Sequence, residues 1–213
     1  KDNLHTIKAG ANREFFNSNN LEIWNKNEKL RIVTHHWGTN KNKGYDVYEY
    51  IDKLISKEPW KNMIEFTFIG NLPKNYTFRD SKVIKPLYGK ELGDELKKNH
   101  IYITGSLFEP SGNHHIEAAQ CGLPILYIDS GGTSEYCKNF GIKYTIDNLE
   151  DKLALFMENS SEYYEMMQYY PNDSKVMSKE FLELFSFYNK SRSEIFKKRS
   201  IPNLNLMKRL YIN

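Results

Sequence analysis

Short apolar runs rich in β-branched residues alternate along this chain with segments whose apolar residues recur at helical spacing. The runs of strand type lie at residues 30–34, 64–69, 82–85, 101–104, 124–128 and 142–146. The segments of helical type between them lie at residues 45–56, 89–99, 116–121 and 134–139. Strands separated by helices form parallel βαβ units with right-handed crossovers. The sequence therefore predicts an α/β fold, Rossmann-like, with a mostly parallel sheet and helices on both faces.

The two ends of the chain differ from this alternating centre. Residues 1–27 are rich in asparagine and lack a sustained period, which is typical of a linker or the remainder of a preceding domain. The alternation predicts one domain over residues 28–170, followed by helices and a tail over residues 171–213. One apolar stripe of these last helices consists of Met177, Phe181, Leu184, Phe185 and Tyr188. Because the chain begins at Lys1 without a methionine, we expect it to be part of a longer protein.

Charge and cysteine content exclude several classes of protein. The 213 residues carry 30 basic and 27 acidic side chains, a net charge of +3 that is too small and too mixed for a dedicated nucleic-acid binder. No apolar run approaches the roughly 20 residues that span a bilayer, and no secretory signal is visible. Cys121 and Cys137 lack metal-ligand spacing, so we expect small core residues in a reducing compartment, and hence a cytoplasmic protein.

Three loops that contain glycine and polar residues follow predicted strands, at residues 35–44, 105–115 and 129–134. The carboxyl ends of parallel strands meet at one edge of a sheet, where ligands bind. The second loop leads into a helix, so the backbone N–H groups of Ser111, Gly112, Asn113 and His114 can face an anion such as a phosphate. A compatible alternative is that Ser111 or Asn113 simply caps the helix.

Glu109 and Glu117 flank the second loop, eight positions apart. On a helix that spacing is off by about 80°, so the loop must fold back if both acids are to share a pocket. One carboxylate would then accept hydrogen bonds from ribose hydroxyls, and the other would orient a sugar. The alternative is a helix-terminal acid at Glu117 and a solvated acid at Glu109. Lys43, and more weakly Lys41, are candidate phosphate cations, although lysines in loops are usually only solvated.

Two adjacent histidine pairs, His35–His36 and His114–His115, suggest a metal at first sight. Neighbours in sequence seldom point at one centre, and no third ligand follows at a zinc-like interval, so we expect no metal. A Ser-His-Asp triad is disfavoured because no nucleophile-elbow motif is present.

A resemblance to glycosyltransferase family 4 comes from the run Glu109-Pro-Ser-Gly-Asn-His-His-Ile-Glu117-Ala-Ala-Gln-Cys-Gly-Leu-Pro124, followed by Gly131-Gly-Thr-Ser-Glu135. Lys43-Gly44 ahead of a helix is similar to a further family mark. The family consists of retaining, nucleotide-sugar-dependent enzymes of the two-domain GT-B fold. The resemblance implies that this chain is the carboxy-terminal, donor-binding half of such an enzyme.

The resemblance also implies roles for individual residues. Glu117 would bind the ribose of the nucleotide and Glu109 the donor sugar near the reacting carbon. The amides of residues 111–114 would hold sugar and diphosphate oxygens, and Gly131-Gly132 would belong to the same donor site. Lys43 would neutralise the departing diphosphate, an electrostatic role. Glu109 and Lys43 are thus the predicted catalytic residues, and neither a metal nor another cofactor is implied.

The chain departs from the family pattern in two ways. An arginine is common five or six positions before the lysine, where this chain has Trp37 or Gly38, so Lys41 is the expected substitute. Second, the amino-terminal acceptor domain is absent, so we expect that domain or a partner subunit to complete the site for a glycan or lipid-linked acceptor. Peripheral membrane association would run through that missing half, and the isolated chain would be inactive. The alternatives are a non-catalytic nucleotide-binding module and, less favoured, a sugar-nucleotide epimerase.

Overall fold

The structure, a computed structural model, describes residues 5–192 of the chain. It divides into two compact units, of which the larger comprises Lys8–Val176. The smaller comprises Lys1–Ile7 and Met177–Asn213. The domain ranges expected from the sequence, residues 1–27, 28–170 and 171–213, stay predictions, and the last of them lies partly outside the described residues.

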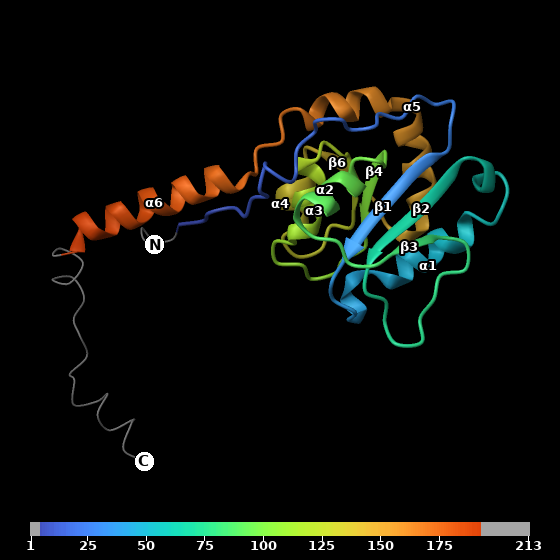
Figure 1. Ribbon diagram of the computed structural model, residues 1–213, viewed down its shortest axis with the longest axis horizontal. Coiled ribbons are helices and arrows are strands. Elements are labelled where there is room, and N and C mark those ends of the chain that lie inside the picture. The colour runs from blue at the N-terminus through green and yellow to red at the C-terminus, as the bar shows by residue number, and fades with distance from the viewer. Residues whose placement is uncertain (1–4, 193–213) are drawn as a thin grey trace, which may run out of the picture. The chain divides into compact units, whose positions relative to one another are not determined.

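The larger unit is built on a six-stranded parallel sheet in the order β3-β2-β1-β4-β5-β6 (Figure 1). Its strands are β1 Leu30–His36, β2 Ile64–Gly70, β3 Lys82–Ile84, β4 Ile101–Thr104, β5 Ile125–Tyr127 and β6 Gly141–Lys143. The central strand β1 pairs with β2 from Leu30↔Ile64 to His36↔Gly70, and with β4 through Ile32↔Ile101. The predicted parallel α/β sheet is confirmed, and its strand order reverses between β1 and β4.

Helices cover both faces of the sheet, as predicted. They are α1 Tyr45–Leu54, α2 Gly89–Leu96, α3 Asn113–Gln120, α4 Thr133–Cys137 and α5 Leu149–Met167. The side chains of α1 and α5 share one buried core with Ile32, whereas those of α2, α3 and α4 share the other core with Val33. Neighbouring strand residues point to opposite faces, so a strand covered on both sides is apolar throughout. This is why the central strands β4 and β5 are mainly apolar in sequence and completely buried.

Most element boundaries differ from the prediction by one to three residues, and two of the differences have a clear cause. The strand predicted over residues 142–146 ends at Lys143, because the Asn148 side-chain oxygen accepts the Thr145 backbone N–H at 2.8 Å and turns the chain into a 3₁₀ turn. Helix α3 begins at Asn113, three residues before the predicted start at Ile116. Its first turn is polar, so the apolar periodicity begins only after that turn.

The helical pattern predicted from Asn148 onward is interrupted after α5. The interruption contains Pro171, whose ring cannot continue a helix. Asp173 then starts helix α6, Ser174–Lys190, because its side-chain oxygen accepts the backbone N–H groups of Lys175 and Val176 at 2.7 and 3.0 Å. The predicted carboxy-terminal helices are therefore confirmed up to Lys190, and residues 193–213 lie outside the described residues.

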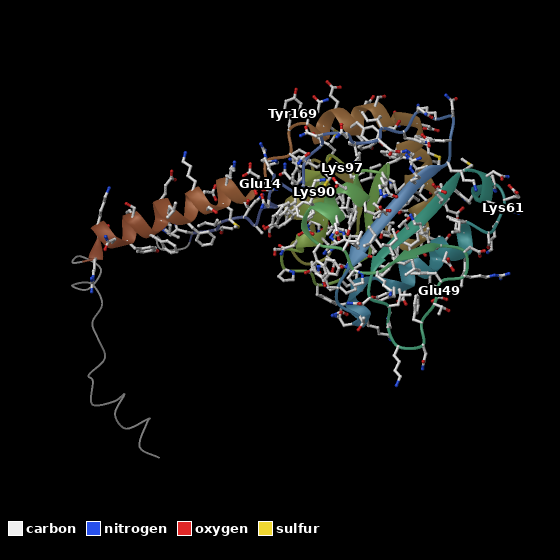
Figure 2. The ribbon with its side chains drawn as sticks, in the orientation of Figure 1. Glu14, Glu49, Lys61, Lys90, Lys97 and Tyr169 are labelled. Carbon is white, nitrogen blue, oxygen red and sulfur yellow. The ribbon has the colours of Figure 1, made fainter. Side chains whose placement is uncertain are left out.

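The two long carboxy-terminal helices differ in burial. Leu149, Leu153 and Phe156 of α5 are completely buried in the core of the sheet. In contrast, α6 contains no buried side chain, and Phe185 in its predicted stripe is 61% exposed. Charged side chains such as Lys61 project outward from the larger unit (Figure 2). The core of the described protein thus belongs to the sheet and its five covering helices.

Candidate functional site

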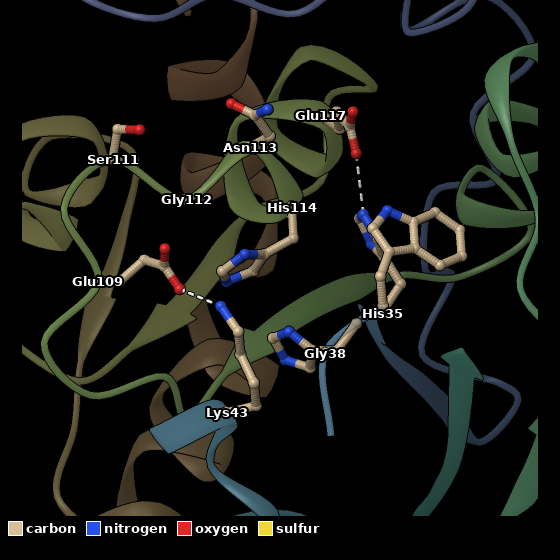
Figure 3. A pocket seen from close by; sticks show the side chains of 11 residues that line it. His35, Gly38, Lys43, Glu109, Ser111, Gly112, Asn113, His114 and Glu117 are labelled. Carbon is tan, nitrogen blue, oxygen red and sulfur yellow. Dashed lines mark hydrogen bonds and ion pairs between the residues drawn. The ribbon is translucent and has the colours of Figure 1, made fainter. Parts of the chain in front are cut away.

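A pocket of about 390 Å³ opens at the carboxyl ends of β1 and β4, where the strand order reverses (Figure 3). Residues 35–38 at the end of β1 and Lys43 form one side of its lining. The other side comes from the β4–α3 loop and the first part of α3, between Glu109 and Glu117. A reversal of strand order is where an open parallel sheet leaves a crevice for a ligand.

The structure brings most of the predicted site residues to this pocket. Those that line it are Lys43, Glu109, Ser111, Gly112, Asn113, His114 and Glu117. The loop folds back as the shared site requires, so the two acids line one cavity despite their spacing. Lys41 does not line the pocket and is exposed, and Gly131 and Gly132 do not line it either. The binding roles of all these residues stay predictions.

Glu109 and Lys43 form an ion pair inside the pocket. The Lys43 ammonium donates to Glu109 Oε2 at 2.6 Å, with the carboxylate side chain 12% and the lysine side chain 23% exposed. Lys43 follows β1 and Glu109 follows β4, so the pair joins the two strands at the reversal (Figure 3). An ammonium has three N–H donors, so Lys43 can keep this bond and still contact an anion.

Gly131 and Gly132 contact the backbone of Glu109 from outside the pocket lining. The Gly132 backbone N–H donates to the Glu109 carbonyl at 2.7 Å, and Gly131 forms an isolated bridge with Glu109. Gly131 has a φ of +64°, and a Cβ there would lie 2.4 Å from the Glu109 carbonyl oxygen. Only glycine allows this approach without strain. These backbone contacts of Gly131 and Gly132 therefore help to position Glu109.

The amino-terminus of α3 points into the pocket with its backbone N–H groups uncapped. Gly112 precedes the helix with a φ of +61°, and a Cβ there would meet the His115 ring at 2.5 Å. No side chain caps α3, so the alternative of a Ser111 or Asn113 cap is not observed. Glu117 lies beyond the first turn, which weakens its interpretation as a helix-terminal acid. Free N–H groups and the positive end of the helix dipole favour an anion here.

His35 contacts Glu117, a contact that was not predicted, although His35 lies in the first of the three predicted site loops. Its Nε2 lies 2.9 Å from Glu117 Oε2, and the histidine is 1% exposed (Figure 3). The backbone of His35 is fixed by the Tyr102 hydroxyl, which accepts from the His35 N–H at 3.1 Å and lies 3.3 Å from the His35 carbonyl. The one available signal was a pair of histidines directly after a buried strand.

The other histidines at this edge, His36, His114 and His115, are buried, and the first two contact hydroxyl groups. His36 Nε2 lies 2.5 Å from the Tyr48 hydroxyl, and His114 Nε2 lies 2.9 Å from the Thr104 hydroxyl. Burial, reinforced by neighbouring histidines, holds the pKa of His36 and of His114 well below the ordinary value. Burial likewise lowers the pKa of His115 to about 4. These rings are therefore neutral at physiological pH and add no fixed positive charge.

Trp37 and Gly38 are the two positions at which the resemblance leads one to expect an arginine, and both line the pocket. The Trp37 side chain is aromatic. Its ring stacks on that of Tyr88, with centroids 4.5 Å apart and planes inclined by 12°. Trp37 lines the pocket and is 38% exposed. Within residues 5–192, Lys43 is the one lysine or arginine of the lining. An aromatic surface therefore replaces a cation at this point of the pocket.

The described residues contain neither a cluster of metal ligands nor a membrane-spanning helix. Between residues 5 and 192, no three histidine, cysteine or acidic side chains gather in a way that could hold a metal ion. No helix in the same range combines the length and apolarity needed to cross a bilayer. Cys121 and Cys137 are buried and unpaired, which confirms their prediction as core residues.

Comparisons with known proteins agree with this geometry. A family model described as "Glycosyl transferases group 1" matches residues 19–173, which include every residue of the pocket lining. No curated protein sequence matches the chain.

Solved structures share the fold at low sequence identity. Sucrose-phosphate synthase from Thermosynechococcus elongatus is 14% identical with a TM-score of 0.64, and the matched region covers 89% of this chain and 53% of the synthase chain. HepE from Anabaena, solved with UDP and glucose, is 14% identical with a TM-score of 0.64, and the matched region covers 85% of this chain and 56% of the HepE chain. The carboxy-terminal domain of LpcC, a group 1 family protein from Francisella tularensis, is 16% identical with a TM-score of 0.56, and the matched region covers 81% of this chain and 98% of that domain. The chain therefore spans about half the length of the first two and nearly all of the single domain.

Proposed function

Because the chain belongs to the group 1 glycosyl transferases, we propose that its pocket binds the nucleotide diphosphate sugar donor of a retaining sugar transfer. One observation carries the proposal: two carboxylates, a lysine and an uncapped helix amino-terminus line a single cavity at the sheet reversal. Carboxylates accept hydrogen bonds from sugar hydroxyls, while the lysine and the helix terminus attract phosphate oxygens. A nucleotide sugar presents both kinds of group, in one molecule.

In this proposal, Glu117 accepts hydrogen bonds from the ribose hydroxyls and Glu109 accepts them from the donor sugar. The diphosphate lies between them, over the amino-terminus of α3 and beside Lys43. The ion pair of 2.6 Å supports this order, because it keeps the lysine next to the acid that orients the reacting sugar. HepE, a structural relative, was solved with UDP and glucose, which agrees with a ligand of this class.

The chemical step is proposed to retain the anomeric configuration. The bond between the sugar C1 and the diphosphate oxygen breaks, and the acceptor oxygen bonds to C1 on the same face. The electron pair of the broken bond stays on the diphosphate, where negative charge builds, and the acceptor proton then passes to the departing phosphate oxygen. Lys43 and the α3 amino-terminus stabilise that charge in place, without rearranging in the transition state. The neighbouring histidines, whose pKa values are lowered by burial, contribute little to this neutralisation.

The acceptor site is proposed to lie on another domain or subunit. The chain spans about half the length of sucrose-phosphate synthase and HepE. Exposed apolar side chains on α6, including Phe181 and Leu182, give such a partner an apolar surface to cover. By itself the chain then binds the donor and transfers sugar poorly or not at all, and its acceptor is a glycan or a lipid-linked saccharide.

Calorimetric titration of the chain with UDP, GDP, ADP and their hexose conjugates tests the proposal. At least one series is expected to bind, and Glu117→Ala should weaken that binding. The absence of binding to every nucleotide at millimolar concentration would contradict it. If a nucleotide binds, addition of the amino-terminal half and an acceptor separates an enzyme from a non-catalytic module. The configuration of the transferred sugar, read by NMR, then tests retention.

A further inference from the structure

The donor pocket contains an ionisable group that the proposed chemistry does not use. His35 is buried and only 1% exposed. Its Nε2 nevertheless lies 2.9 Å from Glu117 Oε2. The two residues are 82 positions apart and meet because β1 and α3 converge at the pocket. A carboxylate only accepts hydrogen bonds, so the imidazole donates its Nε2–H. The described residues offer Nδ1 of the same ring no hydrogen-bond partner.

The position of the His35 ring is fixed from several sides. Both backbone polar groups of His35 contact the Tyr102 hydroxyl, at 3.1 and 3.3 Å. The ring packs edge-on against Tyr102 with centroids 5.5 Å apart, and against Trp37 at 6.2 Å. β1 itself pairs on both sides, with β2 and β4. A donor held this rigidly can impose its own geometry on a flexible partner.

Glu117 is such a partner. Its side chain is 22% exposed, has three rotatable bonds and lies in a cavity that also holds the Lys43 ammonium. Among the interactions of the described residues, the bond to His35 is the one that engages the Glu117 carboxylate, and it occupies Oε2. Oε1 is therefore left to accept a hydrogen bond from a ligand.

We propose that His35 is the positioning residue of the donor site: its Nε2–H holds the Glu117 carboxylate so that Oε1 is presented to the ribose hydroxyls of the nucleotide. The inference rests on the proposed function, which assigns the ribose to Glu117, and extends it to a residue outside the family motif. Loss of His35 then weakens the binding of ligands that have ribose hydroxyls and leaves the binding of ligands that lack them unchanged. A purely structural histidine would weaken both kinds of ligand alike.

The experiment compares two ligands on three forms of the full chain. The ligands are the best-bound nucleoside diphosphate among UDP, GDP and ADP, and its 2′,3′-dideoxy analogue. The forms are the unaltered protein, His35→Leu, which removes the donor, and His35→Gln, whose amide nitrogen restores one. We expect the unaltered protein to prefer the ribose form about tenfold, as one good hydrogen bond to a charged group allows. His35→Leu should bring that preference below threefold with the dideoxy affinity unchanged, and His35→Gln should regain most of it.

Controls separate this role from a loss of folding. His100→Asn changes another completely buried histidine, one outside the pocket lining, and should leave both affinities unchanged. Thermal melts establish the folded fraction of each variant. In a Glu117→Ala background, His35→Leu should add no further loss of preference, because its partner is already gone.

Three results would overturn the inference in distinguishable ways. If His35→Leu keeps the tenfold preference, or weakens both ligands equally, His35 does not act through Glu117. If the unaltered protein binds both ligands equally, the ribose assignment of Glu117 is wrong. If it binds neither ligand, the proposed function itself fails.

Discussion

At the scale of single residues, the two lysines of the loop after β1 give a matched test. Lys43→Ala should lower the affinity for a nucleoside diphosphate by roughly 10- to 100-fold, since a hydrogen bond to a charged group is worth about 1.5–3 kcal/mol. The monophosphate should lose less, because it ends short of the β-phosphate that Lys43 is proposed to contact. Calorimetry with UDP and UMP, or with the corresponding pair for the preferred base, measures both losses.

Lys41→Ala is the control for this prediction. Lys41 belongs to the same 3₁₀ turn, Lys41–Lys43, but is exposed and does not line the pocket. Its removal should change the diphosphate affinity less than twofold. A larger effect of Lys41→Ala than of Lys43→Ala would mean that the loop rearranges on binding, and would assign the phosphate to the other lysine.

The same two lysines show where sequence reasoning reaches its limit at this scale. Spacing and residue type placed Lys43, Glu109 and Glu117 as candidates, and all three line one cavity. The choice between Lys43 and Lys41 depends on the phase of a three-residue turn, which the sequence leaves open. The bond from His35 to Glu117 spans 82 residues and requires the register of the sheet, so no local pattern predicts it.

At the scale of elements, helices α5 and α6 should respond differently to the same substitution. Phe156 of α5 is completely buried, so Phe156→Ala should destabilise the chain by about 3–5 kcal/mol. Phe185 of α6 is 61% exposed, so Phe185→Ala should change the unfolding free energy by less than about 0.5 kcal/mol. Urea unfolding followed by circular dichroism measures both. A comparable loss in the two variants would show that something covers α6 in solution.

Prediction was more successful for elements than for residues. Every predicted strand of the sheet is present, because the central strands, which are buried on both faces, leave mainly apolar runs in the sequence, and the edge strands keep short apolar runs. The errors fall at element ends, where polar side chains decide the boundary. Asn148 ends β6 early, and the polar first turn of α3 hides its start at Asn113. That turn is also the proposed phosphate contact, so function accounts for its lack of apolar periodicity.

At the scale of the whole molecule, buried histidines should make stability depend on pH. Burial lowers the pKa of His100 and of His115 to about 4, against about 6.5 for an exposed histidine. Between these values the unfolded chain binds a proton that the folded chain does not, so stability falls as the pH falls from 6.5 towards 4. Each group should remove roughly 2 kcal/mol at pH 5 relative to pH 7.5. Urea unfolding at the two pH values measures the loss.

His100→Asn isolates one of these groups. The Asn side-chain oxygen can replace His100 Nδ1, which accepts the Arg31 backbone N–H at 3.0 Å, while carrying no proton that titrates. The variant should therefore lose less stability than the unaltered protein between pH 7.5 and pH 5. An identical loss in both proteins would show that His100 does not contribute to the pH dependence.

The larger unit should also fold and bind nucleotide without the remainder of the chain. All residues that line the pocket lie within Lys8–Val176, and α6 supplies no buried side chain to its cores. A chain shortened to residues 8–176 keeps Asp173, which pairs with Arg13 at 2.9 Å, so the segment after α5 stays attached. We expect the nucleotide affinity of the shortened chain to match that of the full chain within about twofold, because the affinity depends on the folded pocket, which both chains contain. Glu117→Ala should weaken binding equally in both chains, which identifies the pocket as the same one. A tenfold loss in the shortened chain, with a cooperative melt retained, would instead assign part of the donor site to residues outside the sheet and its covering helices.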